Sequence, residues 1–197
     1  MTASESQSRI SKKRRRASCR AGLVKPPQLT SRPRFAPNVP INDIQVISRN
    51  GNDRVFYNLT GALNGPRNVQ INMGTGNNRF VGTIRRDLLP AANLNINVNS
   101  GAGNDRIVLN QIGSLQPGSA FSFNANAGGG NNNVVYQTTN LVSIGAGSFL
   151  GVNLNSGGGN DTLLTRINAV DNGQIQANTS TGGQWASAAG SGRTNDA

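Results

Sequence analysis

The sequence contains no histidine and a single cysteine, Cys19. Without histidine the chain has no Ser-His-Asp triad, no imidazole general base and no histidine-ligated zinc. A single cysteine excludes an intramolecular disulfide. No apolar run approaches the roughly 20 residues that a membrane-spanning helix requires. The composition therefore excludes several common kinds of catalytic and metal site, and it predicts no membrane span.

Acidic residues are also few, with 8 Asp and Glu against 19 Lys and Arg, and the charge of +11 is unevenly distributed. Residues 1–40 hold ten basic residues and one acid, a balance of +9, whereas residues 41–197 hold nine basic and seven acidic residues, a balance of +2. Five of the eight prolines also lie in 1–40. Because this segment offers little apolar surface to bury, we predict a disordered basic arm over 1–40. The small polar residues of 186–197 predict a disordered tail.

The basic arm contains a run of five consecutive cations. These candidate nucleic-acid-binding residues are Lys12, Lys13, Arg14, Arg15 and Arg16. A basic run in a disordered arm can neutralise phosphates, although no aromatic residues are interleaved for base stacking. The residues that follow are interrupted by Arg20 and Lys25, so the pattern does not predict a cleaved secretory signal.

A cluster rich in glycine and asparagine recurs five times along the chain. The copies are NGND at 50–53, GTGNN at 74–78, GAGND at 101–105, GGGNN at 128–132 and GGGND at 157–161. The asparagines that they share are separated by 25, 27, 27 and 29 residues. Nearly constant spacing of this kind indicates a structural repeat of about 27 residues.

The segments on either side of each cluster repeat as well. Before the cluster, apolar residues alternate with asparagine, as in LNINVN at 94–99. After it comes a short run rich in β-branched residues, as in RIVLN at 106–110. Both patterns are typical of β-strands, and connectors that contain Pro, Gly or Asn close each unit. No helical period is sustained, so the sequence predicts an all-β repeat protein.

Two ways of stacking these units remain open. The units can form five to six coils of a parallel β-helix or β-solenoid over residues 41–185, or they can form stacked antiparallel β-hairpins. The recurring asparagine favours the solenoid, because asparagine side chains stacked in register can hydrogen-bond along the solenoid axis as an internal ladder. Residues 173–185, GQIQANTSTGGQW, resemble a degenerate sixth unit that caps the core. The predicted core residues are Val55, Phe80, Leu94, Ile96, Val98, Ile107, Leu109, Phe121, Phe123, Val134, Leu154 and Leu163.

The clusters resemble the nonapeptide G-G-x-G-x-D-x-U-x of the RTX, or haemolysin-type, calcium-binding repeats. The best matches are SGAGNDRIV at 100–108 and GGGNDTLL at 157–164, and the resemblance covers about nine residues of each unit. It implies calcium ligation by aspartates of successive turns, which here are Asp53, Asp105 and Asp161.

The sequence departs from the RTX pattern in two respects. The motif occurs once per long unit, and Asn78 and Asn132 replace aspartate in alternate units. In a solenoid the neighbouring aspartates would therefore lie two coils apart, roughly 9 to 10 Å. The alternative to metal ligation is that Asp or Asn acts as a turn residue that bonds its own backbone.

Two further sets of polar residues occupy equivalent positions in successive units. Arg54, Arg79 and Arg106 follow the turns and predict either solvated side chains or a strip that binds anions. A second set, made of asparagines, predicts an outward face. This face is either a solvated polar surface or a binding site for sugar hydroxyls, although no aromatic residues accompany it as a platform for sugar rings. Its members are Asn95, Asn97, Asn99, Asn124, Asn126, Asn153 and Asn155.

No group of carboxylates in the repeat region suggests a catalytic site, so we expect no enzymatic activity. The leading hypothesis is a non-enzymatic structural or adhesive solenoid module of a bacterial surface or secreted protein. Its expected partners are surface polysaccharide or other repeat modules, and its expected location is extracellular or on the cell surface. The first alternative is an RTX-like module with calcium as its only cofactor. The second is a nucleic-acid-associated protein that acts through the basic arm.

Overall fold

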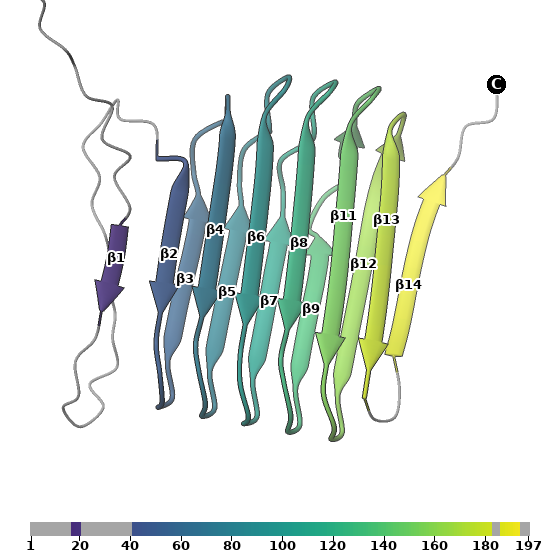
Figure 1. Ribbon diagram of the computed structural model, residues 1–197. Helices are drawn as coiled ribbons and strands as arrows, with labels where there is room; N and C mark the ends of the chain where they lie inside the picture. The colour runs from purple at the N-terminus through teal and green to yellow at the C-terminus, as the bar shows by residue number, and fades with distance from the viewer. Residues whose placement is uncertain (1–16, 21–40, 183–185, 194–197) are drawn as a thin grey trace, which may run out of the picture.

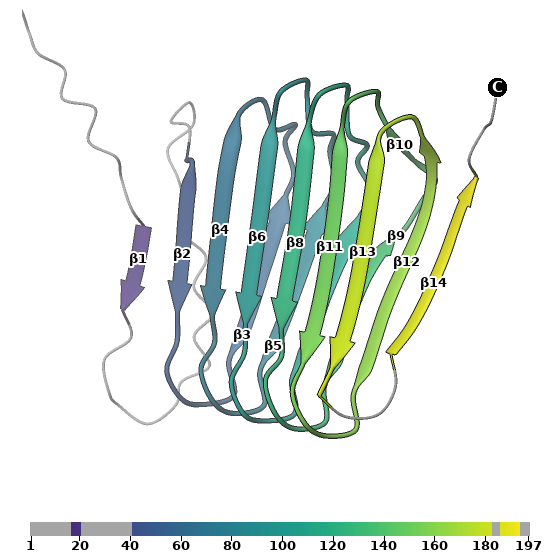
Figure 2. The ribbon, with the colours of Figure 1, turned by 45° about the vertical axis from the view of Figure 1, so that its right-hand side comes forward.

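The computed structural model describes residues 17–20, 41–182 and 186–193. The described residues form strands, turns and loops, without a helix that could cross a membrane. Every strand pair is parallel, and the strands are arranged in two sheets that face each other (Figures 1 and 2). The prediction of a parallel β-solenoid is therefore confirmed, and the stacked hairpins are excluded because they would require antiparallel pairs.

The first sheet has the strand order β1-β2-β4-β6-β8-β11-β13. Its strands are β1 (Ala17–Arg20), β2 (Asp43–Ile47), β4 (Pro66–Asn72), β6 (Asn93–Asn99), β8 (Ala120–Asn126), β11 (Phe149–Ser156) and β13 (Gln174–Thr181). The second sheet has the order β10-β12-β9-β7-β5-β3, and β14 pairs with β12. Its strands are β3 (Arg54–Leu59), β5 (Arg79–Ile84), β7 (Arg106–Gln111), β9 (Asn133–Thr138), β10 (Val142–Ile144), β12 (Thr162–Asp171) and β14 (Ala186–Arg193).

Each coil takes one long strand from each sheet. The chain runs along β6, turns through a glycine-rich corner, and returns along β7 in the opposite direction (Figure 1). At the other end of the coil, the isolated bridges Leu63↔Leu88, Leu88↔Leu115 and Leu115↔Ile144 form a narrow third ladder. Five coils stack in this way, and β13 and β14 begin a sixth.

The register is constant from coil to coil, so equivalent residues of successive repeats lie side by side. In the first sheet, for example, Ile71 pairs with Val98, which pairs with Ala125. Because side chains alternate between the two sides of a strand, each sheet has one side that faces the core and one side that faces outward. The alternating sequence pattern follows directly from this arrangement.

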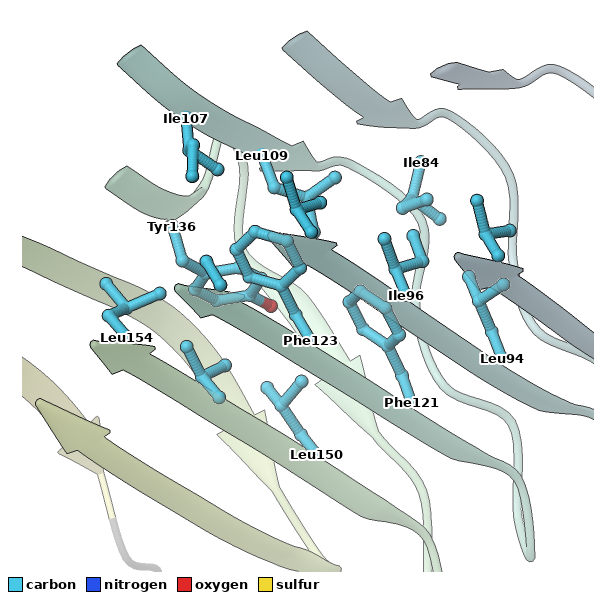
Figure 3. Packing of buried hydrophobic residues seen from close by; sticks show 14 of the residues in the cluster. Ile84, Leu94, Ile96, Ile107, Leu109, Phe121, Phe123, Tyr136, Leu150 and Leu154 are labelled. Carbon is cyan, nitrogen blue, oxygen red and sulfur yellow. The ribbon is translucent and has the colours of Figure 1, made fainter. Parts of the chain in front are cut away.

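The core lies between the two sheets (Figure 3). All the predicted core residues are buried except Val55, which is half-buried against the core. Tyr136 lies among them and contacts the rings of Phe121 and Phe123, with centroid distances of 6.3 and 6.1 Å. Its hydroxyl donates a hydrogen bond to Gln111, which gives this polar group a partner inside the core, and burial raises the pKa of Tyr136 well above its ordinary value.

The structure differs from the predicted boundaries at both ends of the solenoid. β1 lies within the segment expected to be a disordered arm and pairs with β2. β14 lies within the segment expected to be a disordered tail and pairs with β12. β13 supplies the first strand of the expected sixth unit, whereas Trp185 lies outside the described residues.

Candidate functional site

The five glycine corners are the turns that connect the first sheet to the second. They comprise residues 48–53, 73–78, 100–105, 127–132 and 156–161. The fourth position of every corner is a glycine with positive φ, between 120° and 144°. A Cβ atom at Gly103 would lie 2.2 Å from the carbonyl oxygen of Gly76 in the preceding coil. Glycine is therefore required here both by the backbone conformation and by the close stacking of the coils.

A ladder of asparagines runs along the surface of the corners. The Oδ1 atom of Asn77 accepts a hydrogen bond of 2.8 Å from the backbone N–H of Asn104, and Asn104 accepts one of 2.8 Å from Asn131. The same bond links Asn52 to Asn77 and Asn131 to Asn160. The ladder expected from the sequence is thus present. It lies on the exterior and joins side chains to backbone, whereas we expected an internal ladder of side chains.

A second ladder lies beneath the first and runs in the opposite direction. The backbone N–H of Asn78 donates to Oδ1 of Asp105 at 2.7 Å, and that of Asp105 donates to Oδ1 of Asn132 at 2.9 Å. Equivalent bonds join Asp53 to Asn78 and Asn132 to Asp161. Asn78, Asp105, Asn132 and Asp161 are between 2% and 7% exposed. These side chains therefore bond the backbone of the preceding coil.

In the corners with asparagine, the side-chain amide also closes its own turn. Nδ2 of Asn78 donates to the carbonyl oxygens of Gly76 at 2.9 Å and Gly74 at 3.2 Å. Nδ2 of Asn132 donates to Gly130 at 3.1 Å and Gly128 at 3.2 Å. Asparagine thus supplies an acceptor for the neighbouring coil and a donor for its own coil.

An ionised aspartate in the same position can accept hydrogen bonds but cannot donate them. Accordingly, the Oδ2 atoms of Asp105 and Asp161 are buried without a hydrogen-bond partner. Burial raises the pKa of Asp105, and this effect exceeds the opposing influence of the Ser100 hydroxyl and of the N–H groups of Asn78. The ladder therefore holds Asp105 in a place where its neutral form is favoured relative to water.

Serine accompanies aspartate at the start of the corner, and this correlation is visible in the sequence. Ser48, Ser100 and Ser156 begin the corners with aspartate, whereas Met73 and Ala127 begin those with asparagine. The hydroxyl of Ser48 donates to Oδ2 of Asp53 at 2.5 Å. The hydroxyl oxygens of Ser100 and Ser156 accept bonds of 3.2 and 3.1 Å from the asparagine amides of the preceding coils. The serine at the start of an aspartate corner thus bonds the aspartate of its own corner, as Ser48 does, or the asparagine of the preceding coil, as Ser100 and Ser156 do.

Replacing Asp105 with asparagine is expected to stabilise the protein at neutral pH by about 1 to 3 kcal/mol, the cost of one unsatisfied buried polar group. The new amide would donate to Gly103, as Asn78 does to Gly76. Because the folded-state pKa of Asp105 is raised, its contribution to stability is fully present below the unfolded value of 3.8 and is lost as the pH rises through the folded value. The gain from Asp105→Asn should therefore increase with pH, as measured by urea denaturation. The exposed Asp43→Asn is the control, and a gain of equal size there would contradict the explanation.

The three candidate calcium ligands are not brought together. The register places the coil of Asn78 between those of Asp53 and Asp105, and the coil of Asn132 between those of Asp105 and Asp161. Within the described residues there is no group of three or more Cys, Asp or Glu side chains that could hold a metal ion. Each corner with aspartate therefore offers one carboxylate, together with hydroxyl and carbonyl oxygens.

The outward side of the first sheet is covered by asparagine and glutamine. Four amides form a side-chain ladder of three hydrogen bonds, in which Asn124 donates to Asn97 at 3.0 Å, Asn153 to Asn124 at 2.8 Å and Asn178 to Asn153 at 2.9 Å. A shallow groove of about 550 Å³ lies over this side, and no charged residue lines it. The outward asparagines predicted from the sequence are thus on one face, and part of their hydrogen-bonding capacity is used within the row.

The outward side of the second sheet contains the predicted arginine row. Arg54 pairs in register with Arg79, and Arg79 pairs with Arg106. All three are exposed, and none of them forms an ion pair with a described residue. The row continues as Asn133 and Thr162 in the later coils. The candidate nucleic-acid-binding residues Lys12–Arg16 lie outside the described residues.

Comparison with models of protein families, with curated protein sequences and with solved structures found no match. The class of the protein is therefore defined by its own structure, which is that of a parallel β-solenoid with glycine corners.

Proposed function

We propose that the protein is a non-enzymatic structural or adhesive module of a bacterial surface or secreted protein. The observation that supports this proposal most strongly is the constant register of the coils, which places equivalent side chains in straight rows on two outward faces. Rows that repeat about every 4.8 Å can contact a partner that is itself repetitive. Surface polysaccharide and other repeat modules are partners of this kind.

The test is retention of the full chain on insoluble polysaccharides, combined with an assay for newly formed reducing ends. We expect saturable binding to at least one polysaccharide without cleavage. Turnover of any bound polysaccharide would contradict a non-enzymatic role. Failure to bind any polysaccharide, together with failure to associate with a second copy of the chain, would contradict an adhesive role.

Calcium binding at the corners with aspartate is the second candidate function. It is supported by the buried Oδ2 atoms of Asp105 and Asp161, since a cation would provide the partner that these atoms lack. If calcium binds the folded chain, the melting temperature must rise with calcium concentration by mass action. Asp105→Asn should then reduce this shift. An identical melting temperature in chelator and in millimolar calcium would exclude this candidate.

A further inference from the structure

The arginines of the solenoid gather on the outward side of its second sheet. In residues 41–182 there are eight arginines and six aspartates. Arg54, Arg79, Arg106 and Arg166 lie at outward positions of the second sheet. Arg85 follows β5 and reaches the same side, where its Nε donates to Asn58 at 3.3 Å. None of the outward positions of β3, β5, β7, β9 and β12 is acidic. The excess of positive charge on this face is therefore larger than that of residues 41–182 as a whole.

An apolar row lies beside the three stacked arginines. Phe56 pairs in register with Val81 and Val81 with Val108, and the row continues to Val135 and Leu164. Phe56 is 63% exposed, which is unusual for a large apolar side chain. The next row contains Asn58, Thr83, Asn110, Gln137 and Arg166. An apolar strip parallel to the solenoid axis is thus bordered by arginine on one side and mainly by amides on the other.

The aspartates nearest to the arginine row are turned away from it. Asp53 accepts a hydrogen bond from Ser48, and Asp105 is buried in its corner. Guanidinium groups without acidic partners are well suited to carboxylate, sulfate or phosphate, because they can form charge-assisted, often bidentate hydrogen bonds. Like charges stacked about 4.8 Å apart repel one another, and a bound anion would relieve this repulsion.

We propose that the outward side of the second sheet binds a linear acidic polysaccharide that lies along the solenoid axis. This proposal rests on the adhesive function proposed above and specifies its ligand. A polymer with one carboxylate on each sugar residue repeats over a distance close to the spacing of the coils. Its carboxylates would bind Arg54, Arg79 and Arg106, and the apolar faces of its rings would lie on Phe56 and its row.

Two alternatives are less well supported, namely a nucleic acid on this face and a ligand on the first sheet. Single-stranded nucleic acid also combines anions with flat rings, but successive bases require successive aromatic platforms, and among the described residues of this face Phe56 is the one exposed aromatic side chain. The first sheet offers a groove, but its lining is uncharged and its amides bond one another. Neutral hydrogen bonds exposed to water contribute less to binding than charge-assisted ones.

The test compares two double variants of the full chain that remove the same charge. Arg79→Gln with Arg106→Gln alters the proposed face, whereas Arg49→Gln with Arg86→Gln removes two exposed arginines elsewhere. Binding to polygalacturonate is measured by calorimetry at low and physiological salt, and circular dichroism verifies folding. We expect the first variant to bind about tenfold more weakly or worse, and the second to remain within about twofold of the parent.

The basic arm requires its own control, since it could bind a polyanion by charge alone. Both double variants are therefore repeated in a chain in which Lys12–Arg16 are replaced by glutamine, and the difference between them should persist. Equal affinities for the two double variants would overturn the proposal. Both double variants are also titrated with single-stranded DNA. If Arg79→Gln with Arg106→Gln weakens the binding of single-stranded DNA but not of polygalacturonate, the proposal is likewise overturned. Binding to neutral dextran but not to polygalacturonate would overturn this proposal while the adhesive function stands.

Discussion

Replacing Asn132 with aspartate is expected to destabilise the protein by about 3 to 5 kcal/mol at neutral pH, the cost typical of a buried charge without its partners. The two N–H groups of the Asn132 side-chain amide are shared among four acceptors, in Gly128, Gly130, Ser156 and Asp161. An ionised carboxylate has no donor for any of these acceptors. It would also lie in register between Asp105 and Asp161, so that three buried carboxylates would occupy adjacent coils.

Urea denaturation at constant pH measures this effect, and the neighbouring Asn131→Asp provides the control. Asn131 belongs to the exposed ladder, where its Oδ1 atom accepts a hydrogen bond of 2.9 Å from Asn160. A carboxylate retains this acceptor and remains in contact with water, so we expect a change of less than about 1 kcal/mol. Equal losses at the two positions would contradict the distinction between the buried ladder, in which the asparagine amide also donates, and the exposed ladder, in which Asn131 is used as an acceptor.

Replacing Gly159 with alanine is expected to cost about 3 kcal/mol or more, because strain and a steric clash combine. Gly159 has φ of 138°, a conformation that other residues rarely adopt. A Cβ atom at this position would lie 2.1 Å from the carbonyl oxygen of Gly130. That oxygen also accepts a hydrogen bond from Asn132, so a shift of the backbone would disturb the buried ladder as well.

The adjacent Gly158 provides a matched control within the same corner. Nothing lies within 4 Å of a Cβ atom built at Gly158, and its φ is outside the positive range. The equivalent residues of other coils include Thr75 and Ala102, which is consistent with a tolerant position. Gly158→Ala should therefore change the free energy of unfolding by less than about 0.5 kcal/mol. A loss comparable to that of Gly159→Ala would show that the corner rejects any side chain, contrary to the structure.

The parallel fold and its core could be predicted from the sequence because a solenoid repeats the same environment in every coil. One residue type at one position, such as Asn77 and its equivalents, indicates stacking in register, and the alternation around Ile96 indicates which side of the strand is buried. The arginine row follows from the same reasoning, since Arg54, Arg79 and Arg106 occupy one position of the repeat.

The buried ladder could not be predicted in the same way. In the sequence, Asn78 and Asp105 look interchangeable, because both are common turn residues. Asparagine differs from ionised aspartate in having an N–H donor. The importance of this donor can be recognised only from the positions of the carbonyl oxygens around the side chain, which the sequence does not give. The alternation of Ser100 with Met73 and Ala127 was visible, but its meaning depends on contacts between coils.

A titration of the Asp105 side-chain carboxyl by carbon NMR in the folded protein tests most directly whether this residue is a buried structural partner or a metal ligand, with Asp105→Asn used to assign the signal. A structural Asp105 should titrate with a midpoint above 3.8, because burial in the place of an asparagine disfavours the charged form. Calcium should leave this midpoint unchanged. A midpoint at or below 3.8, or one that falls when calcium is added, would contradict the structural role and favour a metal ligand.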